Sequence, residues 1–333
     1  MRCWTLTGDL NAPLRLENRP DPELGPGQVR VRLRAASLNY RDLIMADRPP
    51  RPGLIPVSDG AGDVVEAAPD VVDVRPGDRV AGGFFADWAS GPSRHANLGS
   101  ALGGDVDGVL SELVVYQATA VTKIPDALTF AEAATFPCAG VTAWHALVGH
   151  HSPVGADDTV LALGTGGVAI FALQVARMRG ARFIGTTSHE AKRERLQALG
   201  ADVILNYAAT PGWGQETQEV TGGHGADFVV ETGGAATLDQ SLQACARGGC
   251  VTLIGVISGV ADTADASLVH NRELTLRGIY VGPVTMLHDA LEAFADHDVH
   301  PVIDRSFGFD DAPEAFSYLR QARHIGKVVI EPR

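Results

Sequence analysis

At 333 residues the chain is longer than one hydrophobic core usually accommodates, so we expect two domains. Hydrophobic residues make up 45% of the chain and charged residues 20%, as in ordinary globular proteins, and no apolar run is long enough to cross a membrane. The net charge of −13 and the lack of a basic stripe argue against nucleic acid as a partner.

The four cysteines and the polar N-terminal segment indicate where the protein works. Cys3, Cys138, Cys245 and Cys250 form no metal-binding or disulfide pattern, and the first residues lack the features of a secretion signal. We therefore expect a reduced, cytoplasmic protein.

The N-terminal part of the chain, to about residue 125, is rich in strand and turn signals. Residues 28–34 alternate between apolar and polar side chains, which predicts a half-buried strand. A second strand signal, residues 64–67, follows the turn-prone Asp59–Gly62, and the turn at Arg75–Asp78 leads into another strand. This part of the chain is predicted to be mainly β-structure.

Residues 86–108 contain few apolar side chains and predict a long loop. Phe84, Phe85 and Trp88 introduce it. These aromatic residues either line an apolar substrate entrance or pack beneath the loop, and the sequence does not separate the two readings.

From about residue 129 the pattern changes to alternating strands and helices, which predicts a parallel sheet with crossover helices. A helix is expected at 189–199, ending at Gly200, and later helices at 286–296 and 311–321. A final strand at 327–330 is expected to rejoin the first domain. The six strands predicted for the parallel sheet are 159–164, 182–187, 202–206, 226–231, 250–255 and 275–281.

The most informative segment is the apolar strand that runs into a glycine turn at residues 159–167. Gly164, Gly166 and Ala169 have the G-x-G-x-x-G/A spacing, and a helix is predicted at 168–179. The first glycine permits a tight turn, the second lets the backbone approach a pyrophosphate, and the helix N-terminus attracts that anion. The segment predicts a dinucleotide-binding site.

The order of motifs along the whole chain resembles the medium-chain dehydrogenase/reductase superfamily. The resemblance implies an α/β protein with a GroES-like β-barrel catalytic domain at 1–128, completed by 297–333. It also implies a doubly wound, parallel Rossmann sheet at 129–296. The matching motifs are Ala36–Asp42, Pro56–Gly62, Arg75–Val80, Gly164–Val168 and Gly326–Val329.

Departures from the superfamily pattern bear on the metal. Zinc alcohol dehydrogenases bind the catalytic ion through a cysteine, a Gly-His-Glu motif and a second cysteine. Here Asn39 resembles the first position, residues 57–59 (Val-Ser-Asp) replace Gly-His-Glu, and Cys138 alone matches. One thiolate cannot replace the three or four ligands that zinc needs, so no zinc is expected. The Asn-Tyr-Arg-Asp motif is similar to that of zinc-lacking quinone oxidoreductases.

The second strand of the dinucleotide-binding unit indicates which cofactor is used. NAD-specific sites usually carry an acidic residue there, whereas this strand ends in Thr187 and Ser188, with Lys192 shortly after. Hydroxyls and a lysine suit the 2′-phosphate of NADPH, although Glu190 adds a nearby negative charge. We favour NADPH over NADH. The residues predicted to contact the cofactor, several of them through the resemblance, are Thr142, Gly164, Thr165, Gly166, Gly167, Val168, Thr187, Ser188, Lys192, Tyr207, Gly255 and Lys327.

Without a metal, a hydride acceptor needs hydrogen-bond donors or a delocalised charge. Asn39 offers an amide and Tyr40 a phenol, so these are the candidate catalytic residues; Asn39 is favoured over Tyr40, for which a packed aromatic is the more ordinary interpretation. The leading hypothesis is a zinc-independent, NADPH-dependent oxidoreductase that transfers a hydride to a small-molecule substrate, a quinone, enone or other activated carbonyl. The alternatives are an NAD(P)-dependent alcohol dehydrogenase or ketone reductase, and a non-catalytic nucleotide-binding protein. The resemblance also implies a homodimer formed through the last Rossmann strand.

Overall fold

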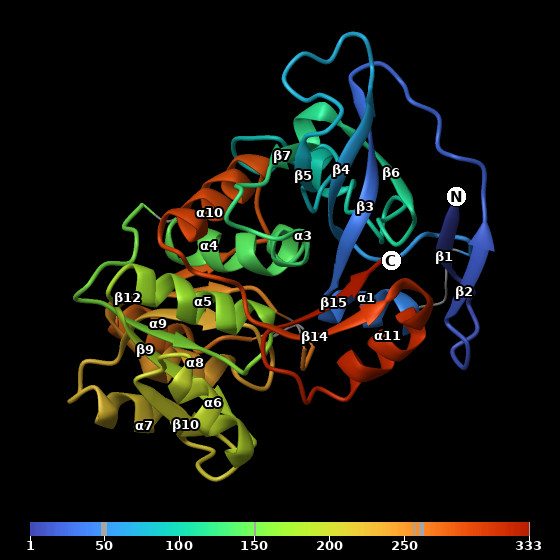
Figure 1. The fold of residues 1–333 in the computed structure, drawn as a ribbon. Coiled ribbons are helices and arrows are strands. Elements are labelled where there is room, and N and C mark those ends of the chain that lie inside the picture. The colour runs from blue at the N-terminus through green and yellow to red at the C-terminus, as the bar shows by residue number, and fades with distance from the viewer. Residues whose placement is uncertain (48–51, 150, 256, 260–262, 333) are drawn as a thin grey trace. The chain divides into compact units, whose positions relative to one another are not determined.

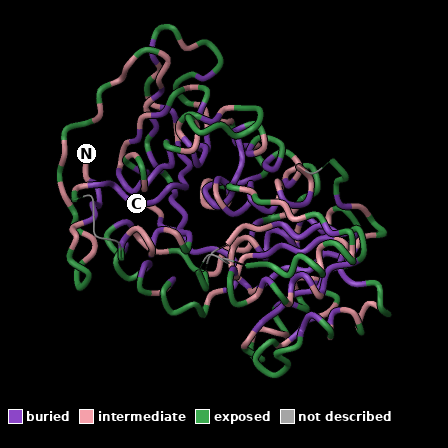
Figure 2. Tube along the Cα trace, turned by 180° about the vertical axis from the view of Figure 1, so that it is seen from behind, coloured by how far each residue is buried: buried purple, intermediate pink, exposed green. Residues whose placement is uncertain are grey.

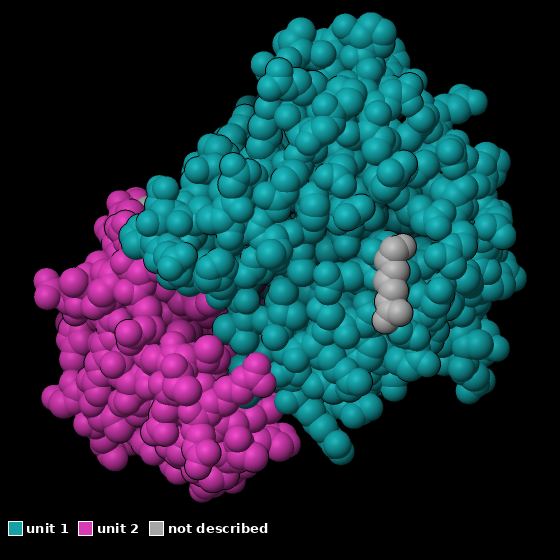
Figure 3. Space-filling model, viewed as in Figure 1, with its two compact units in different colours: residues 1–141, 281–333 teal, residues 142–280 magenta. Residues whose placement is uncertain are grey.

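The computed structural model describes residues 1–47, 52–149, 151–255, 257–259 and 263–332. The chain forms two compact units (Figure 3): unit 1 contains residues 1–141 and 281–333, and unit 2 contains residues 142–280. Residues 129–141 and 281–296, which the sequence analysis places in the Rossmann domain, therefore belong by their contacts with unit 1. Unit 2 is inserted between two stretches of unit 1.

Unit 1 is built on a seven-stranded sheet in the order β14-β15-β3-β4-β5-β7, with β6 also pairing with β3. All pairs in it are antiparallel except β14 with β15. A separate antiparallel pair is formed by β1 and β2. The strands are β1 (Arg2–Leu6), β2 (Leu14–Asn18), β3 (Gln28–Leu38), β4 (Asp59–Ala67), β5 (Arg79–Gly82), β6 (Leu113–Gln117), β7 (Val121–Lys123), β14 (Ile303–Gly308) and β15 (Lys327–Glu331).

Strand β15 joins the two stretches of unit 1, because it lies between β14 and β3 (Figure 1). Its register pairs Val328 with Leu38 and Val329 with Ser37. Val328 and Ile330 are buried in the core of this unit. The register thus places the first residue of β15, Lys327, beside the end of β3.

Helices and helical turns of unit 1 flank this sheet. Helix α3 begins with a capping box, in which Thr129 and Glu132 satisfy each other's backbone N–H groups. The elements are α1 (Tyr40–Asp47), α2 (His95–Leu98), η1 (Ala118–Ala120), α3 (Phe130–Ala133), the π-helical turn η2 (Phe136–Gly140), α10 (Val284–Asp296), η4 (Phe309–Asp311) and α11 (Ala312–Arg320). Helix α4 (Val141–Leu147) begins at the boundary with unit 2.

Unit 2 contains a six-stranded parallel sheet in the order β10-β9-β8-β11-β12-β13. Numbered from β8, this is the 3-2-1-4-5-6 order of the Rossmann fold, with its switch point between β8 and β11. Most residues of the central strands of this sheet are buried (Figure 2), whereas β13, at one edge, has no buried residue. The strands are β8 (Thr159–Ala162), β9 (Arg182–Thr187), β10 (Val203–Asn206), β11 (Ala226–Glu231), β12 (Cys245–Leu253) and β13 (Thr275–Gly278).

Crossover helices connect these parallel strands, as the alternating pattern predicted. Helix α5 follows the glycine turn and buries an apolar face that includes Ile170, Phe171 and Leu173. The helical elements are α5 (Gly167–Met178), η3 (Glu190–Lys192), α6 (Arg193–Ala198), α7 (Trp213–Val220), α8 (Leu238–Ala244) and α9 (Ala266–Asn271). Gly200, after α6, has φ of +99°, which suits its predicted place at a helix end.

The segment predicted as a long loop, 86–108, contains some regular structure. Helix α2 lies within it, and isolated bridges join Phe85 to Ala101 and Leu102 to Val106. Phe84, Phe85 and Trp88 are all at most 3% exposed. These aromatic side chains therefore pack inside unit 1 beneath the segment.

None of the helices in the described ranges is long and apolar enough to cross a membrane.

Candidate cofactor and active site

The glycine turn after β8 leaves open space at the N-terminus of α5. Gly164 has φ of +79°, a conformation that strains other residues, and Gly166 is the N-cap of α5. A Cβ added to either glycine would meet nothing within 4 Å. The Gly164 N–H donates to Thr186 Oγ1 at 2.9 Å, which fixes the turn against β9. The free N–H groups of the helix end can therefore approach an anion.

The end of β9 carries the residues predicted to select the cofactor. Thr187 is buried, and its Oγ1 accepts a hydrogen bond from the His189 N–H at 3.1 Å. Ser188 is half-buried and its hydroxyl lies 2.8 Å from His189 Nδ1. The Tyr207 N–H donates to the Thr187 carbonyl at 3.1 Å, which places Tyr207, with 42% of its surface exposed, next to this strand end.

Lys192, in the helical turn that follows β9, reaches the glycine turn. Its Nζ donates to Thr165 Oγ1 at 2.9 Å. The nearby acid, Glu190, is bonded to Arg193 and accepts from Asn206 Nδ2 at 3.3 Å. Arg193 pairs with Glu190 and lowers the pKa of that carboxyl group. The negative charge that Glu190 adds near the proposed 2′-phosphate site is therefore paired with a cation. The positive charge of Lys192 lies at the turn.

Sequence reasoning missed Glu231, at the end of β11. This carboxylate is 1% exposed and accepts from the N–H groups of Gly233 and Gly234, at 2.6 and 2.9 Å. Thr237 Oγ1 at 2.7 Å and Ser241 Oγ also donate to it. The signal in the sequence was an acid ending an apolar strand before Thr-Gly-Gly. Glu231 organises the loop at the carboxyl end of β11, where ligands of such sheets bind.

Gly255, after β12, is held close to the same loop. Its N–H donates to the Glu231 carbonyl at 3.1 Å. A Cβ at this position would lie 1.8 Å from the Thr232 carbonyl oxygen, so glycine alone fits. Gly255, Thr187, Ser188 and the glycine turn all follow the carboxyl ends of strands in unit 2. Val168 is half-buried in the first turn of α5, and Thr142 is buried in α4.

A second group of predicted residues lies in unit 1, where β3 and β15 meet. Lys327 Nζ donates to the Leu38 carbonyl at 2.8 Å and to Asn39 Oδ1 at 2.5 Å. Lys327 is 3% exposed and Asn39 9%. That Lys327 contacts the cofactor stays a prediction, whereas its contacts with Leu38 and Asn39 are observed.

Asp59 connects this lysine to the other positions that the resemblance assigned to metal ligands. Its fully buried carboxylate lies 3.8 Å from Lys327 Nζ, and it accepts from Ser58 Oγ at 2.6 Å and from the Cys138 N–H at 3.1 Å. Burial raises the pKa of Asp59, and the Lys327 charge opposes that rise. Asn39, Ser58, Asp59, Cys138 and Lys327 thus form one buried polar cluster, which we call the Asp59 cluster.

The hydrogen bonding of the Asn39 amide is complete at one end and incomplete at the other. Its Oδ1 accepts a hydrogen bond from Lys327. Its buried Nδ2 forms no hydrogen bond of regular geometry with any described residue. A side-chain hydrogen bond from the Asn39 amide is nevertheless among the causes that lower the pKa of Asp59, so its N–H₂ group interacts with that carboxylate although the geometry is not that of a regular hydrogen bond. A buried donor without an acceptor costs about 1–3 kcal/mol. Such a donor is available to an oxygen atom of a bound molecule.

The neighbours of Asn39 have different environments. Asp42 is buried in α1, and its carboxylate accepts from the Asn39 N–H at 2.7 Å. Burial raises the pKa of Asp42 to about 6, against the opposing charge of Arg41. Tyr40, the other candidate catalytic residue, begins the same helix and is 48% exposed.

The Asp59 cluster does not suit zinc. Burial raises the pKa of the Cys138 thiol well above its usual range, whereas zinc binds the thiolate. The Asp59 carboxylate is already bonded to a hydroxyl, to an N–H and to an ammonium group, and a cation beside the site opposes a second cation. Within the described ranges, no group of three or more His, Cys, Asp and Glu side chains is arranged to hold a metal ion.

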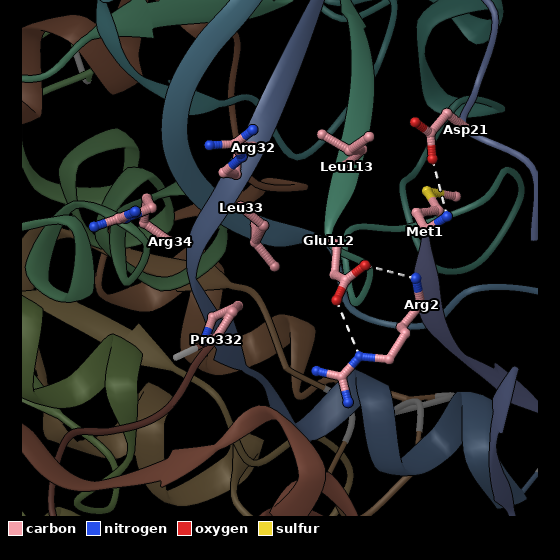
Figure 4. A pocket seen from close by; sticks show the side chains of 9 residues that line it. All are labelled: Met1, Arg2, Asp21, Arg32, Leu33, Arg34, Glu112, Leu113 and Pro332. Atoms are coloured by element: carbon pink, nitrogen blue, oxygen red, sulfur yellow. Dashed lines mark hydrogen bonds and ion pairs between the residues drawn. The ribbon is translucent and has the colours of Figure 1, made fainter. Parts of the chain in front are cut away.

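A separate pocket of about 360 Å³ lies in unit 1 (Figure 4). Arg32 and Arg34 of β3 and the Arg2–Glu112 pair, 3.0 Å apart, line it, and none of the predicted site residues does. Two of its arginines are paired, because Arg2 lies 3.0 Å from Glu112 and Arg34 lies 3.7 Å from Asp63. We assign no function to this pocket.

Comparison with known families and proteins gives concordant results. The family model described as "Alcohol dehydrogenase GroES-like domain" matches residues 25–126, and the model described as "Zinc-binding dehydrogenase" matches residues 167–296. A zinc-type alcohol dehydrogenase-like protein of Schizosaccharomyces pombe is 40% identical over 318 residues, which cover 93% of this chain and 92% of that protein.

Two solved structures are similar over the whole chain. A structure described as an NAD-dependent alcohol dehydrogenase matches with a TM-score of 0.88 and 32% identity, covering 99% of each chain. The 2-octenoyl-CoA carboxylase reductase CinF, solved with NADP and 2-octenoyl-CoA, matches with a TM-score of 0.90 and 25% identity. That match covers 99% of this chain and 87% of CinF.

Proposed function

Because the chain belongs to the medium-chain dehydrogenase/reductase superfamily, as an alcohol dehydrogenase-like oxidoreductase, we propose that it is a zinc-independent enzyme that reduces an activated carbonyl with NADPH. The substrate class is a quinone, an enone or another acceptor whose negative charge is delocalised after hydride addition. The observation that carries this proposal is the Asp59 cluster, in which Asn39, Ser58 and a buried lysine stand at or beside the positions of metal ligands.

The cofactor part of the proposal rests on unit 2. The glycine turn leaves room for a pyrophosphate at the N-terminus of α5, and Lys192 brings a positive charge to Thr165. No acidic residue ends β9, so a 2′-phosphate meets hydroxyls and an ammonium group. These features favour NADPH, although one similar structure is described as NAD-dependent and another contains NADP.

When bound, NADPH supplies a hydride to the substrate. Asn39 donates one of its two Nδ2–H groups to the substrate oxygen on which negative charge develops, and Lys327 holds the other end of that amide. One neutral amide stabilises a localised alkoxide less than a metal ion does. This difference is the physical reason for expecting conjugated acceptors rather than saturated ketones.

An NAD(P)-dependent alcohol dehydrogenase or ketone reductase is the second candidate. The names of the Schizosaccharomyces pombe relative and of one solved structure favour it. This candidate predicts good turnover of simple alcohols and ketones.

A panel assay tests the proposal. Oxidation of NADPH and NADH is followed with a benzoquinone, a short enone and a saturated ketone, and the metal content of the same preparation is measured. We expect kcat/KM to be highest with NADPH and a conjugated acceptor, and activity to survive a chelator. Stoichiometric zinc whose removal abolishes turnover, or a preference for the saturated ketone, contradicts the proposal.

We also propose that the protein forms a homodimer through β13, which ends the strand order of unit 2. An exposed strand edge offers unpaired backbone groups to a second copy. Light scattering after gel filtration measures the mass. A monomer at micromolar concentration contradicts this proposal.

A further inference from the structure

We propose that Lys327 is a positioning residue: its ammonium group fixes the orientation of the Asn39 amide and supplies, beside Asp59, the positive charge that a metal ion supplies in zinc alcohol dehydrogenases. The part that concerns Asn39 rests on the proposed function, in which this amide contacts the substrate. The part that concerns the charge rests on the Asp59 cluster alone.

The orientation of Asn39 follows from the chemistry of the two groups. An ammonium group donates hydrogen bonds and cannot accept them. The Asn39 atom 2.5 Å from Lys327 Nζ is therefore the carbonyl oxygen Oδ1. The N–H₂ group is consequently the other end of the amide, and it makes no hydrogen bond of regular geometry with any residue that the structure describes. Without the lysine, rotation of the amide would no longer be restricted by this bond.

The lysine itself is held in place by the backbone. Its Nζ also donates to the Leu38 carbonyl at 2.8 Å, at the end of β3. The antiparallel pairing of Val328 with Leu38 places Lys327 at this point. The cation is thus fixed by sheet register rather than by a flexible surface contact.

The positive charge of Lys327 lies among the positions that the resemblance assigns to metal ligands. Lys327 contacts Asn39 at the first position and lies 3.8 Å from Asp59, which follows Ser58 in the segment that replaces Gly-His-Glu at the second. Asp59 in turn accepts from the backbone N–H of Cys138 at the third position. A buried carboxylate requires a compensating charge, and the ammonium group provides it here. All three positions are therefore linked around a side-chain cation.

A double-mutant cycle tests the action of Lys327 on Asn39. Asn39→Ala, Lys327→Met and the double variant are compared in kcat and in KM for NADPH and the quinone. We expect each single variant to lose about tenfold to a hundredfold in kcat, with KM for NADPH changed by less than about threefold. The double variant should be no slower than Asn39→Ala, because the lysine acts through that amide.

The cycle needs a control for structural damage. Ser37→Ala removes another buried hydrogen bond between β3 and β15, from Ser37 Oγ to the Val328 carbonyl, and should keep kcat within about twofold. If Lys327→Met does not fold, the cycle is repeated in an Asp59→Asn background, where no unpaired buried carboxylate remains.

Three results of the cycle would overturn the inference about Asn39. Losses that multiply in the double variant mean that the two residues act separately. A raised KM for NADPH at unchanged kcat in Lys327→Met means that the ammonium group binds the cofactor instead. Wild-type kcat in Asn39→Ala means that the amide has no role. In each case zinc-independent reduction by NADPH still stands, so the two proposals fail separately.

A metal titration tests the charge without any turnover. Asn39→Cys and Ser58→His are combined with the native Cys138, once with Lys327 and once with Lys327→Met, and Co²⁺ binding is followed by thiolate charge-transfer absorption. We expect one Co²⁺ per chain only where the lysine is replaced. Binding to both proteins or to neither contradicts the claim that the ammonium group takes the place of a metal ion.

Discussion

The side chain of Lys192 donates a 2.9 Å hydrogen bond to the hydroxyl of Thr165, which links the end of β9 to the glycine turn after β8. These residues are 27 positions apart in the sequence, and both were predicted to contact the cofactor. The bond holds the Lys192 cation in the segment that follows β9, where the 2′-phosphate of NADPH is expected. Two predictions about the cofactor follow from this part of unit 2.

Replacing Lys192 by Met should weaken the binding of NADPH and leave that of NADH nearly unchanged. A charge-assisted hydrogen bond contributes roughly 1.5–3 kcal/mol, so we expect KM for NADPH to rise about tenfold or more. Steady-state kinetics with both cofactors measures the effect. Lys123→Met, which removes an exposed lysine paired with Asp78, is the matched control and should change neither KM. An equal loss for both cofactors would show that Lys192 does not contact the 2′-phosphate.

Replacing Thr187 by Asp should reverse the cofactor preference. The Thr187 hydroxyl accepts from the N–H two residues later, and an aspartate side chain makes the same turn, so the fold should be retained. The new carboxylate would repel a 2′-phosphate and accept from ribose hydroxyls. We expect the ratio of kcat/KM for NADPH to that for NADH to fall at least about tenfold. Thr187→Ser should keep the wild-type ratio.

Asp42 should make the protein less stable as the pH rises from about 4 to 6. Burial raises its pKa to about 6, so over this range the unfolded chain releases a proton that the folded chain retains. Asp42→Asn cannot titrate, and its side-chain oxygen can still accept from the Asn39 N–H. We expect the free energy of unfolding of Asp42→Asn minus that of wild type to rise by about 1–3 kcal/mol as the pH increases from 4 to 7.

Asp47, on the same helix, provides a control of opposite sign. The bonds from Arg320 lower its pKa, so its contribution to stability is present at neutral pH and is lost as the pH falls through that lowered value. Asp47→Asn should therefore lose stability relative to wild type on going from low to neutral pH. Urea unfolding at several pH values measures both variants, and parallel curves for Asp42→Asn and wild type would contradict the assignment.

Glu231→Gln should destabilise unit 2. The buried carboxylate accepts from two N–H groups and two hydroxyls, and an amide nitrogen in place of one oxygen cannot accept. We expect a loss of about 2–4 kcal/mol in thermal or urea unfolding. Ser241→Ala, which removes one donor, should cost less than half as much. Unchanged stability of Glu231→Gln would mean that the loop after β11 does not depend on this carboxylate.

Local patterns in the sequence predicted much of unit 2. The strand expected at 182–187 is β9, with the same bounds, and the helix expected at 168–179 is α5, shifted by one residue. The strand expected at 250–255 begins earlier in the structure, at Cys245. The prediction missed its first residues because Arg247, Gly248 and Gly249 resemble a turn in the sequence. The membership of the superfamily, inferred from motifs, is confirmed.

The Asp59 cluster was harder to predict, since its parts are distant in the sequence. Lys327 lies 288 residues from Asn39, and the register of β15 against β3 decides their contact. The motif containing Lys327 suggested a cofactor contact, and only the pairing of strands revealed the neighbouring amide. The four donors to Glu231 likewise come from a loop and a helix whose conformations the sequence did not specify.

The return of β15 to β3 also has a consequence for synthesis of the protein. Ribosomes add about 5–20 residues per second, so roughly 15–60 s pass between translation of Asn39 and translation of Lys327. Asp59 has no ammonium partner until this interval ends, and every strand of the inserted parallel sheet is translated within it. We therefore expect the nascent chain to complete the parallel sheet of unit 2 first, while the sheet of unit 1 still lacks β14 and β15.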